Sequence, residues 1–212
     1  MIDSSDQTAH IRIVTICGSV RPGNYTSKAL AIVNDELRKH SGVEVIEIDL
    51  DRIALPLPGK AGRDSTTERF IEEVEKASGI VIATPEYHGS FSSVIKLAIE
   101  NLGFPSALAG KPISLLGVAY GRIGAIKALE HLRSVCSHVG AIVLPNPVSV
   151  ARVQEIFDEK GNCLDTESER LIRSVGTALL DYIKEAICPR KALAAMARTG
   201  GRADLTGEHM AL

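Results

Sequence analysis

The sequence predicts an α/β protein in which helices cover both faces of a parallel β-sheet. Five short apolar runs alternate along the chain with five amphipathic stretches. Several of the runs consist almost entirely of Ile, Val, Leu and Ala, which is typical of strands buried on both faces. Repeated strand–helix–strand alternation requires crossover connections, and these make neighbouring strands parallel. At 212 residues, the chain has the length of one such domain.

The apolar runs are the predicted strands. They span residues 11–17, 43–48, 80–84, 113–119 and 141–144. The first, third and fourth are nearly continuous in apolar residues, so we expect them in the middle of the sheet. Residues 43–49 instead alternate apolar side chains with Glu, which is typical of a strand nearer the edge.

Amphipathic helices are predicted between and after these strands. They span residues 26–39, 65–78, 92–102, 123–139 and 167–187. Each places apolar side chains, Ile126 and Leu171 among them, at the i, i+3, i+4, i+7 spacing of one buried face. Five strands with five helices favour the flavodoxin-like strand order 2-1-3-4-5 over the six-stranded dinucleotide-binding order.

The domain is expected to span residues 11–187. Residues 1–10 form a polar N-terminal extension. Residues 188–212 are rich in Ala, Arg and Gly, which predicts either a flexible tail or an arm that packs on a neighbouring subunit.

Composition argues against several classes of function. The 24 basic and 26 acidic side chains give a formal charge of −2, whereas nucleic-acid binding calls for a basic excess. No apolar run approaches the ~20 residues that span a bilayer, and the polar N-terminus lacks a signal peptide's apolar core. We therefore expect a cytoplasmic protein without a membrane partner. The four cysteines form no C-x-x-C pair, so reduced thiols and no metal site are expected.

The loop after the first predicted strand carries many anion donors. In this fold class, ligands bind beyond the carboxyl ends of the strands, where the strand order reverses. The loop at 18–28 opens a helix there, and both its backbone amides and the helix dipole favour a bound anion. Its polar side chains include Ser19, Arg21, Asn24, Thr26 and Ser27. A simple capped turn would also explain Thr26 or Ser27.

Two known phosphate motifs do not fit this loop. A P-loop needs Lys followed by Ser or Thr, and here Asn24 and Tyr25 stand in those places. The dinucleotide fingerprint needs a second glycine where this chain has Val20, so the backbone cannot approach a pyrophosphate closely. A terminal monophosphate is the better fit.

Two further loops are expected at the same edge of the sheet. The first runs from Thr84 to Ser90, and its Tyr87 and His88 could flank a planar ring. The second, residues 117–124, contains three glycines, of which Gly121 could adopt a positive φ in a plain β–α turn. Arg122 could meet an acidic cosubstrate or simply point to water. No G-x-S-x-G elbow is present, which argues against a serine triad.

Together these loops resemble the NADPH-dependent FMN reductase family of flavodoxin-like proteins, and within it the quinone, azo-dye and chromate reductases. The family patterns are G-S-x-R-x-x-S-x-[NST] after the first strand and T-P-E-Y-N after the third. This chain has Gly18-Ser19-Val20-Arg21-Pro22-Gly23-Asn24-Tyr25-Thr26 and Thr84-Pro85-Glu86-Tyr87-His88. The resemblance covers about residues 11–185.

The resemblance implies a set of FMN-binding residues. The phosphate would be held by the first loop: Ser19, Arg21, Asn24, Tyr25, Thr26 and Ser27. The isoalloxazine and ribityl chain would be bordered by Pro85, Glu86, Tyr87, His88 and Gly89, and on the far side by Ala119, Tyr120 and Gly121. The acceptor pocket would be shaped by Tyr87, Tyr120 and Arg122. Two residues depart from the family pattern: Asn24 replaces a serine, and His88 replaces an asparagine and would alter hydrogen bonding at the flavin.

The resemblance also implies an activity. NADPH or NADH would pass a hydride to flavin N5, and a small acceptor (a quinone, free flavin, azo compound or chromate) would then be reduced in a ping-pong cycle. The flavin carries this chemistry, so no catalytic side chain is expected. Family members are usually homodimers or homotetramers. The alternatives are a flavodoxin-type electron carrier, against which the small net charge and Arg21 argue, and an interaction module that binds no flavin.

Overall fold

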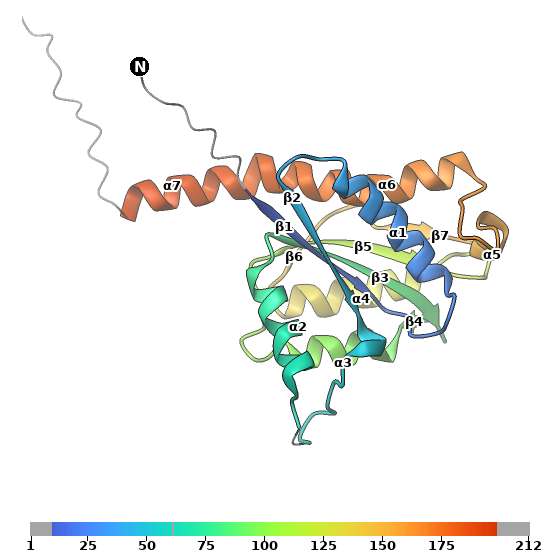
Figure 1. Cartoon of the computed structure of the whole chain (residues 1–212), viewed down its shortest axis with the longest axis horizontal. Helices are drawn as coiled ribbons and strands as arrows, with labels where there is room; N and C mark the ends of the chain where they lie inside the picture. Colours follow the sequence, from blue (N-terminus) through green and yellow to red (C-terminus); the bar gives the residue numbers. More distant parts are fainter. Residues whose placement is uncertain (1–9, 61, 199–212) are drawn as a thin grey trace, which may run out of the picture.

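A twisted parallel sheet forms the centre of the protein (Figure 1). The computed structural model describes residues 10–60 and 62–198. The main strands are β1 (Ile11–Cys17), β2 (Val43–Asp49), β3 (Gly79–Tyr87), β5 (Pro112–Val118) and β6 (Ile142–Val143). Their spatial order, β2-β1-β3-β5-β6, is the predicted 2-1-3-4-5 arrangement. Two short strands were not predicted: β4 (Ser90–Phe91) pairs with β3 and β7 (Val148–Val150) pairs with β5.

Helices cover both faces of this sheet, as predicted. The helices are α1 (Tyr25–Arg38), α2 (Ser65–Lys76), α3 (Ser93–Asn101), α4 (Ile126–His138), α5 (Val153–Ile156) and α6 (Thr166–Tyr182), with a 3₁₀ turn η1 at Leu50–Arg52. One apolar core packs α1 and α6 against the sheet, and a second packs α2, α3 and α4 against the opposite face. Two side chains expected in the buried stripes, Ile126 and Leu171, are exposed, because they lie at the margins of the helix faces that meet the sheet.

The third strand is longer than predicted. The Thr84-Pro85-Glu86-Tyr87 segment, expected as a loop, is the continuation of β3, so that prediction was wrong. Pro85 is tolerated there and lies opposite Val118 of β5. The chain then reverses through His88 (φ 50°) and Gly89 (φ 75°) into β4. Two consecutive positive φ angles are the requirement of a type I′ two-residue hairpin, which explains the reversal.

The C-terminal segment continues as helix. A π-helical turn, η2 (Ile183–Ile187), joins α6 to α7 (Cys188–Arg198), which extends beyond the sheet in Figure 1. Residues 188–198 are therefore helical, and both alternatives, a flexible tail and an arm that packs on another subunit, stay predictions. The polar extension at 1–9 and the end of the tail at 199–212 lie outside the described residues. Within the described part of the chain, every helix is too short or too polar to span a membrane.

Candidate functional site

The loop between β1 and α1 is held tightly against β3. The Gly18 N–H donates to the Ala83 carbonyl at 2.8 Å. A Cβ at Gly18 would lie 2.5 Å from Cγ1 of Ile95 and 2.7 Å from the Ala83 oxygen, so only glycine fits. The start of the loop is thus fixed relative to β3.

Asn24 organises the rest of this loop. Its Oδ1 accepts from the Ser27 N–H at 2.7 Å and caps α1, while its Nδ2 donates to the Arg21 and Ser19 carbonyls at 2.7 and 3.3 Å. The Ser27 hydroxyl donates to the Asn24 carbonyl at 2.8 Å. The side chains of Asn24 and Ser27 are therefore used within the loop. The first-turn amides of Tyr25 and Thr26 have no carbonyl partner inside the helix and are available to a ligand.

Ser19 and Arg21 complete an anion cradle around these amides. Ser19 is buried, and its Oγ has no hydrogen-bond partner within the described residues. An unsatisfied buried hydroxyl costs about 1–3 kcal/mol, which a ligand oxygen would offset. The exposed Arg21 guanidinium lies 4.8 Å from the ring centroid of Tyr87 and links the loop to the end of β3. A buried donor, free helix amides and a cation together fit a phosphate group.

The end of β3 forms the second wall of the site. The Glu86 carboxylate accepts from the Ala128 N–H at 3.1 Å, at the N-terminus of α4. The N-cap residue of that helix, Ala125, has no capping side chain, so Glu86 satisfies one of the free amides of the first turn. The Ser149 Oγ accepts from the Ala125 N–H at 2.8 Å. Glu86 thereby ties the β5–α4 loop to β3.

The β5–α4 loop forms the third wall. Ala119 is bonded on both sides: its N–H donates to the Val150 carbonyl at 2.9 Å, and its carbonyl accepts from the Val153 N–H at 3.1 Å. The exposed Tyr120 packs edge-on against Tyr25, with ring centroids 5.7 Å apart. The positive φ in this loop belongs to Gly124 (78°) rather than Gly121.

These three walls enclose what we call the central cavity, of about 320 Å³. The predicted residues that line it are Ser19, Arg21, Asn24, Tyr25, Thr26, Pro85, Glu86, Tyr87, Ala119 and Tyr120. Sequence reasoning missed Pro22, Gly23, Val118 and Val153, which also line it. Val153 could not be predicted as a lining residue, because it lies on α5, a helix too short to show a periodic pattern in the sequence.

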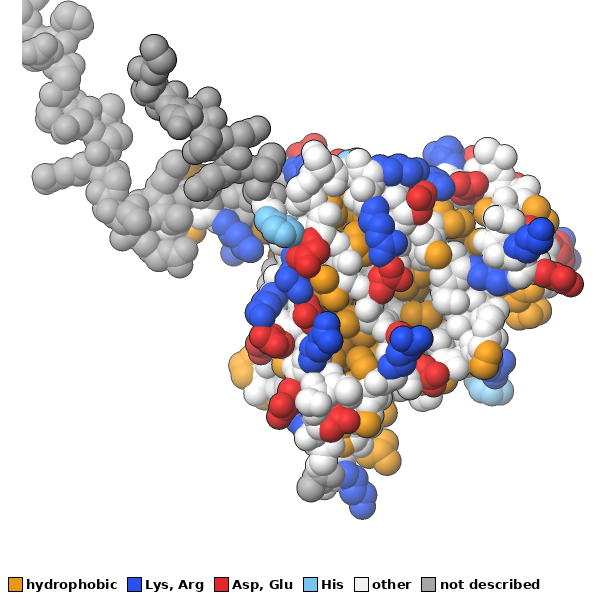
Figure 2. Space-filling model, viewed as in Figure 1, with side chains coloured by type: hydrophobic (Ala, Val, Ile, Leu, Met, Phe, Trp, Pro, Cys, Tyr) orange, Lys and Arg blue, Asp and Glu red, His pale blue; other side chains and the backbone are white. Residues whose placement is uncertain are grey.

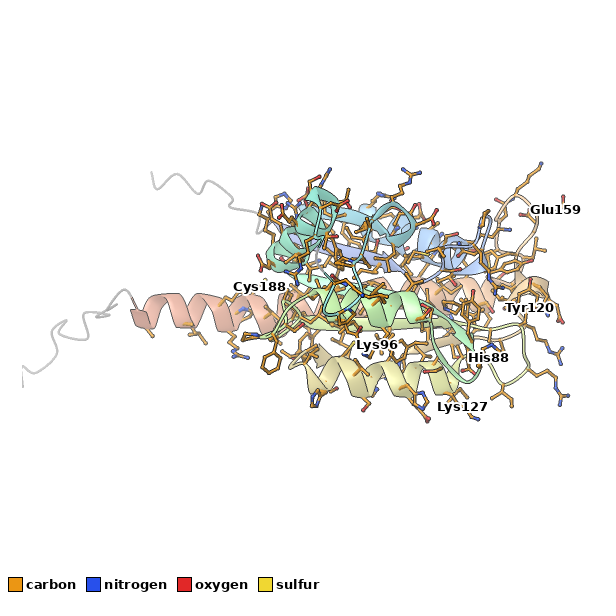
Figure 3. All side chains as sticks on the ribbon, turned by 90° about the horizontal axis from the view of Figure 1, so that it is seen from below. His88, Lys96, Tyr120, Lys127, Glu159 and Cys188 are labelled. Carbon is orange, nitrogen blue, oxygen red and sulfur yellow. The ribbon has the colours of Figure 1, made fainter. Side chains whose placement is uncertain are left out.

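Five predicted residues lie outside this lining. His88 lines a neighbouring hollow together with Arg21, Glu86 and Tyr87. Ser27 faces a second cavity on the other side of the loop. Gly89, Gly121 and Arg122 line neither the central cavity nor that hollow. Figure 3 nevertheless shows His88 and Tyr120 at the same end of the sheet, opposite Cys188.

Charged side chains of both signs are mixed on the visible face of the molecule. On the face shown in Figure 2, Lys and Arg side chains alternate with Asp and Glu side chains and form no extended basic field. Nucleic-acid binding relies on such a field. On this face, as in the overall composition, neither basic nor acidic side chains therefore predominate.

Comparison with known proteins identifies the family. Residues 11–155 match the family model of NADPH-dependent FMN reductase. The chain is 32% identical over 185 residues to an NAD(P)H-dependent FMN reductase of Pseudomonas aeruginosa, covering 82% of this chain and 96% of that protein. It is 28% identical over 180 residues to a quinone reductase of Escherichia coli, again covering 82% and 96%.

Solved structures agree on the fold. The NAD(P)H:acceptor oxidoreductase FerB of Paracoccus denitrificans superposes with a TM-score of 0.70 at 21% identity, covering 82% of this chain and 98% of that one. A flavodoxin from an archaeon superposes with a TM-score of 0.56 at 12% identity, covering 82% and 99%. The chain therefore belongs to the NADPH-dependent FMN reductase family and is an oxidoreductase that uses FMN and NAD(P)H.

Proposed function

We propose that this enzyme reduces a small acceptor, such as a quinone, free flavin, azo compound or chromate, in a ping-pong cycle. The observation that carries the proposal is the central cavity, which joins an anion cradle to an aromatic-lined opening at the point where the strand order reverses. When bound, FMN supplies the two-electron chemistry. The chain supplies one open binding site, which NAD(P)H and the acceptor would occupy in turn.

The anion cradle would hold the FMN phosphate. The Ser19 hydroxyl and the N–H groups of Tyr25 and Thr26 donate to it, and Arg21 adds a positive charge. Asn24 and Ser27 act by holding the loop in shape, since their side chains are already hydrogen-bonded within it. The buried, unpartnered Ser19 Oγ is the strongest support for this assignment.

The other two walls would border the ring and its acceptor. Pro85, Glu86 and Tyr87 lie on one side and Ala119 and Tyr120 on the other. His88, Gly89 and Gly121 stay in the proposal as flanking residues. Tyr87, Tyr120 and Arg122 would shape the place where the acceptor binds. Glu86 is occupied by the N-terminus of α4, so we assign it a positioning role rather than acid–base chemistry.

We also propose that the enzyme is a homodimer or homotetramer. Phe104 is fully exposed, and Ile123 lies exposed in the same loop as Tyr120. Burial against another subunit would remove these apolar side chains from water, which favours association. Light scattering coupled to size exclusion would measure the assembly, and a monomer at micromolar concentration would refute this part.

The first experiment follows the visible spectrum of the anaerobic, FMN-reconstituted protein. One equivalent of NADPH or NADH should bleach the flavin bands promptly, and a family of parallel double-reciprocal plots should accompany acceptor reduction. Bound flavin that stays oxidised would instead indicate a carrier reduced by another protein. Protein that binds no flavin would contradict both the site and the activity.

A pair of variants tests the cradle directly. Removing a charge-assisted interaction costs about 1.5–3 kcal/mol, so Arg21→Ala should weaken FMN binding by about 10- to 100-fold. Arg69→Ala is the matched control, because Arg69 is an exposed arginine on α2, outside the cavity. Quenching of FMN fluorescence measures both affinities. Equal affinities in the two variants would exclude Arg21 from phosphate binding.

A further inference from the structure

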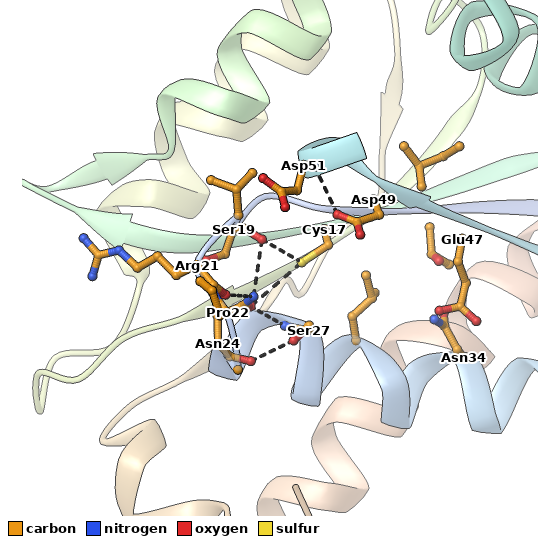
Figure 4. A pocket seen from close by; sticks show the side chains of 15 residues that line it. Cys17, Ser19, Arg21, Pro22, Asn24, Ser27, Asn34, Glu47, Asp49 and Asp51 are labelled. Atoms are coloured by element: carbon orange, nitrogen blue, oxygen red, sulfur yellow. Dashed lines mark hydrogen bonds between the residues drawn. The ribbon is translucent and has the colours of Figure 1, made fainter. Parts of the chain in front are cut away.

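A second cavity lies on the opposite side of the phosphate loop from the central cavity. It has a volume of about 390 Å³ and opens between α1 and the carboxyl ends of β1 and β2 (Figure 4). We call it the β2-side cavity. It shares Ser19 and loop residues 21–24 with the central cavity, but the rest of its lining comes from Val20 and from α1, β1, β2 and η1. The proposed function makes no use of it.

The strand face beneath α1 becomes polar where this cavity opens. β1 and β2 pair in register, and the first two pairs on this face are apolar: Ile11 with Val43, then Ile13 with Val45. The next two pairs are Thr15 with Glu47 and Cys17 with Asp49. Strands under a helix are normally apolar throughout. The change to polar residues falls at the carboxyl ends, where α/β sheets bind ligands.

Two buried polar side chains around the cavity are satisfied neither by the described part of the chain nor by the proposed phosphate site. Thr15 is 0% exposed and Asn34 is 2% exposed. Each has a side-chain oxygen without a hydrogen-bond partner within the described residues, and both residues line this cavity but not the central cavity. Buried polar atoms are normally satisfied, so two unpartnered ones around one hollow indicate a polar ligand.

The cavity wall is rich in hydrogen-bond acceptors. Glu47, Asp49 and Asp51 line it, and the Asn34 atom without a partner is also an acceptor, Oδ1. In Figure 4 the Arg21 side chain points away from this cavity. The ligand must therefore supply donors. Within the described residues, no three acidic, His or Cys side chains are grouped closely enough to hold a metal ion, which favours an organic donor.

Two of these carboxylates are partly occupied. Glu47 is paired with Arg38, and Asp49 Oδ2 lies 3.2 Å from Arg52 Nε while its Oδ1 accepts from the Asp51 N–H at 3.1 Å. Each carboxylate oxygen has a second lone pair for a ligand hydroxyl. Asp51 is exposed and has no ion pair within the described residues. It is the charge most open to an incoming group.

We propose that the β2-side cavity binds the ribose of a nucleotide through free 2′ and 3′ hydroxyls, and that the adenosine half of NADH is its source. The inference rests on the proposed function, because NAD(P)H supplies this ribose. Vicinal hydroxyls donate to carboxylates, and an acid at the end of the second strand, here Asp49, holds a ribose in dinucleotide-binding α/β folds. A 2′-phosphate would meet Asp49 and Asp51, so NADPH should bind less tightly than NADH.

Binding of two small probes to the FMN-reconstituted enzyme tests this subsite. Calorimetry should show binding of 5′-AMP, and adenosine 2′,5′-bisphosphate should bind at least tenfold more weakly. Thr15→Val removes the buried hydroxyl at nearly constant volume and should weaken 5′-AMP about tenfold. Asp51→Asn should reduce the difference in affinity between 5′-AMP and adenosine 2′,5′-bisphosphate. Glu130→Gln, on α4 across the sheet, is the matched control and should change neither affinity.

The outcomes separate this inference from the proposed function. If 5′-AMP does not bind while NAD(P)H still bleaches the flavin, the ribose subsite is refuted and the reductase stands. If 5′-AMP binds but Thr15→Val and Asp51→Asn behave as the control does, the location is wrong. If 5′-AMP binds as expected and the flavin is not reduced, the reductase fails and the subsite stands. If 5′-AMP does not compete with NADH, NADH is not the source.

Discussion

Replacing His88 with Asn should stabilise the protein, because His88 occupies a backbone conformation that most side chains disfavour. Its φ is +50°, and with Gly89 at +75° it forms the two-residue turn between β3 and β4. Asn is the residue most favoured at such a position, since its short side chain tolerates the left-handed region. His88 is exposed, so the substitution removes no buried packing.

The expected gain follows from the cost of this conformation. A left-handed conformation costs an L-residue about 1–2 kcal/mol, and Asn should recover about half of it, roughly 0.5–1 kcal/mol. For a chain of this size, 1 kcal/mol corresponds to about 2–4 °C in melting temperature. His88→Asn should therefore raise the melting temperature by about 1–4 °C.

The reverse substitution provides the control within the same chain. Asn146 is also exposed and has a φ of +57°, so Asn146→His should lower stability by a similar amount. Urea unfolding of both variants and the wild type gives the free energies. A loss of stability in His88→Asn, or no change in either variant, would refute the reasoning from backbone conformation.

The His88→Asn variant also distinguishes two roles for the histidine that stands where the family pattern has asparagine. If His88 matters only through the turn, His88→Asn leaves the midpoint potential of the bound flavin unchanged. If its ring hydrogen-bonds at the flavin, the potential shifts. Anaerobic titration against a reference dye measures this potential.

Three further predictions concern two contacts at the site and one thiol buried in the core. Gly18→Ala should destabilise the protein by about 1–3 kcal/mol and weaken FMN binding, measured by urea unfolding and fluorescence quenching, because its Cβ would lie 2.5 Å from Ile95 Cγ1. Glu86→Ala should cost about 1.5–3 kcal/mol through the lost bond to Ala128, and Glu86→Gln less, in thermal melts. Burial raises the pKa of Cys136 from 9.0 to about 12. Between these two pKa values only the unfolded chain ionises this thiol. The contribution of Cys136 to the unfolding free energy therefore falls by about 1.4 kcal/mol per pH unit as the pH rises. The unfolding free energy of Cys136→Ala, measured by urea unfolding over this pH range, should not show this fall.

The parts of the fold that local patterns determine were predictable. Apolar runs and helical periodicity placed the five main strands, because burial against a sheet imposes those patterns on the sequence itself. The number of strands and helices then favoured their order. The strands β4 and β7 are only two and three residues long, and they form because a neighbouring strand offers free backbone groups. Such pairing leaves no periodicity to detect.

The site was predictable as a set of loops but not in its internal bonding. Ser19, Arg21 and Tyr87 line the central cavity as expected. The roles of Asn24 and Glu86 depend on partners that only the folded chain brings close: the carbonyls of the same loop, and an amide of α4, 42 residues away along the chain. The hairpin at His88 was missed because the strong Asn-Gly signal is absent.

The two hydrogen bonds of Ala119 and the bond from Glu86 to α4 have a consequence for the shape of the cavity walls before flavin binds. These contacts join backbone and side-chain groups of the chain alone, so the walls of the central cavity are assembled without a ligand. We therefore expect flavin binding to cost little ordering entropy. The Ala128 amide should exchange its hydrogen slowly both with and without flavin, which hydrogen-exchange measurements on the two forms would check.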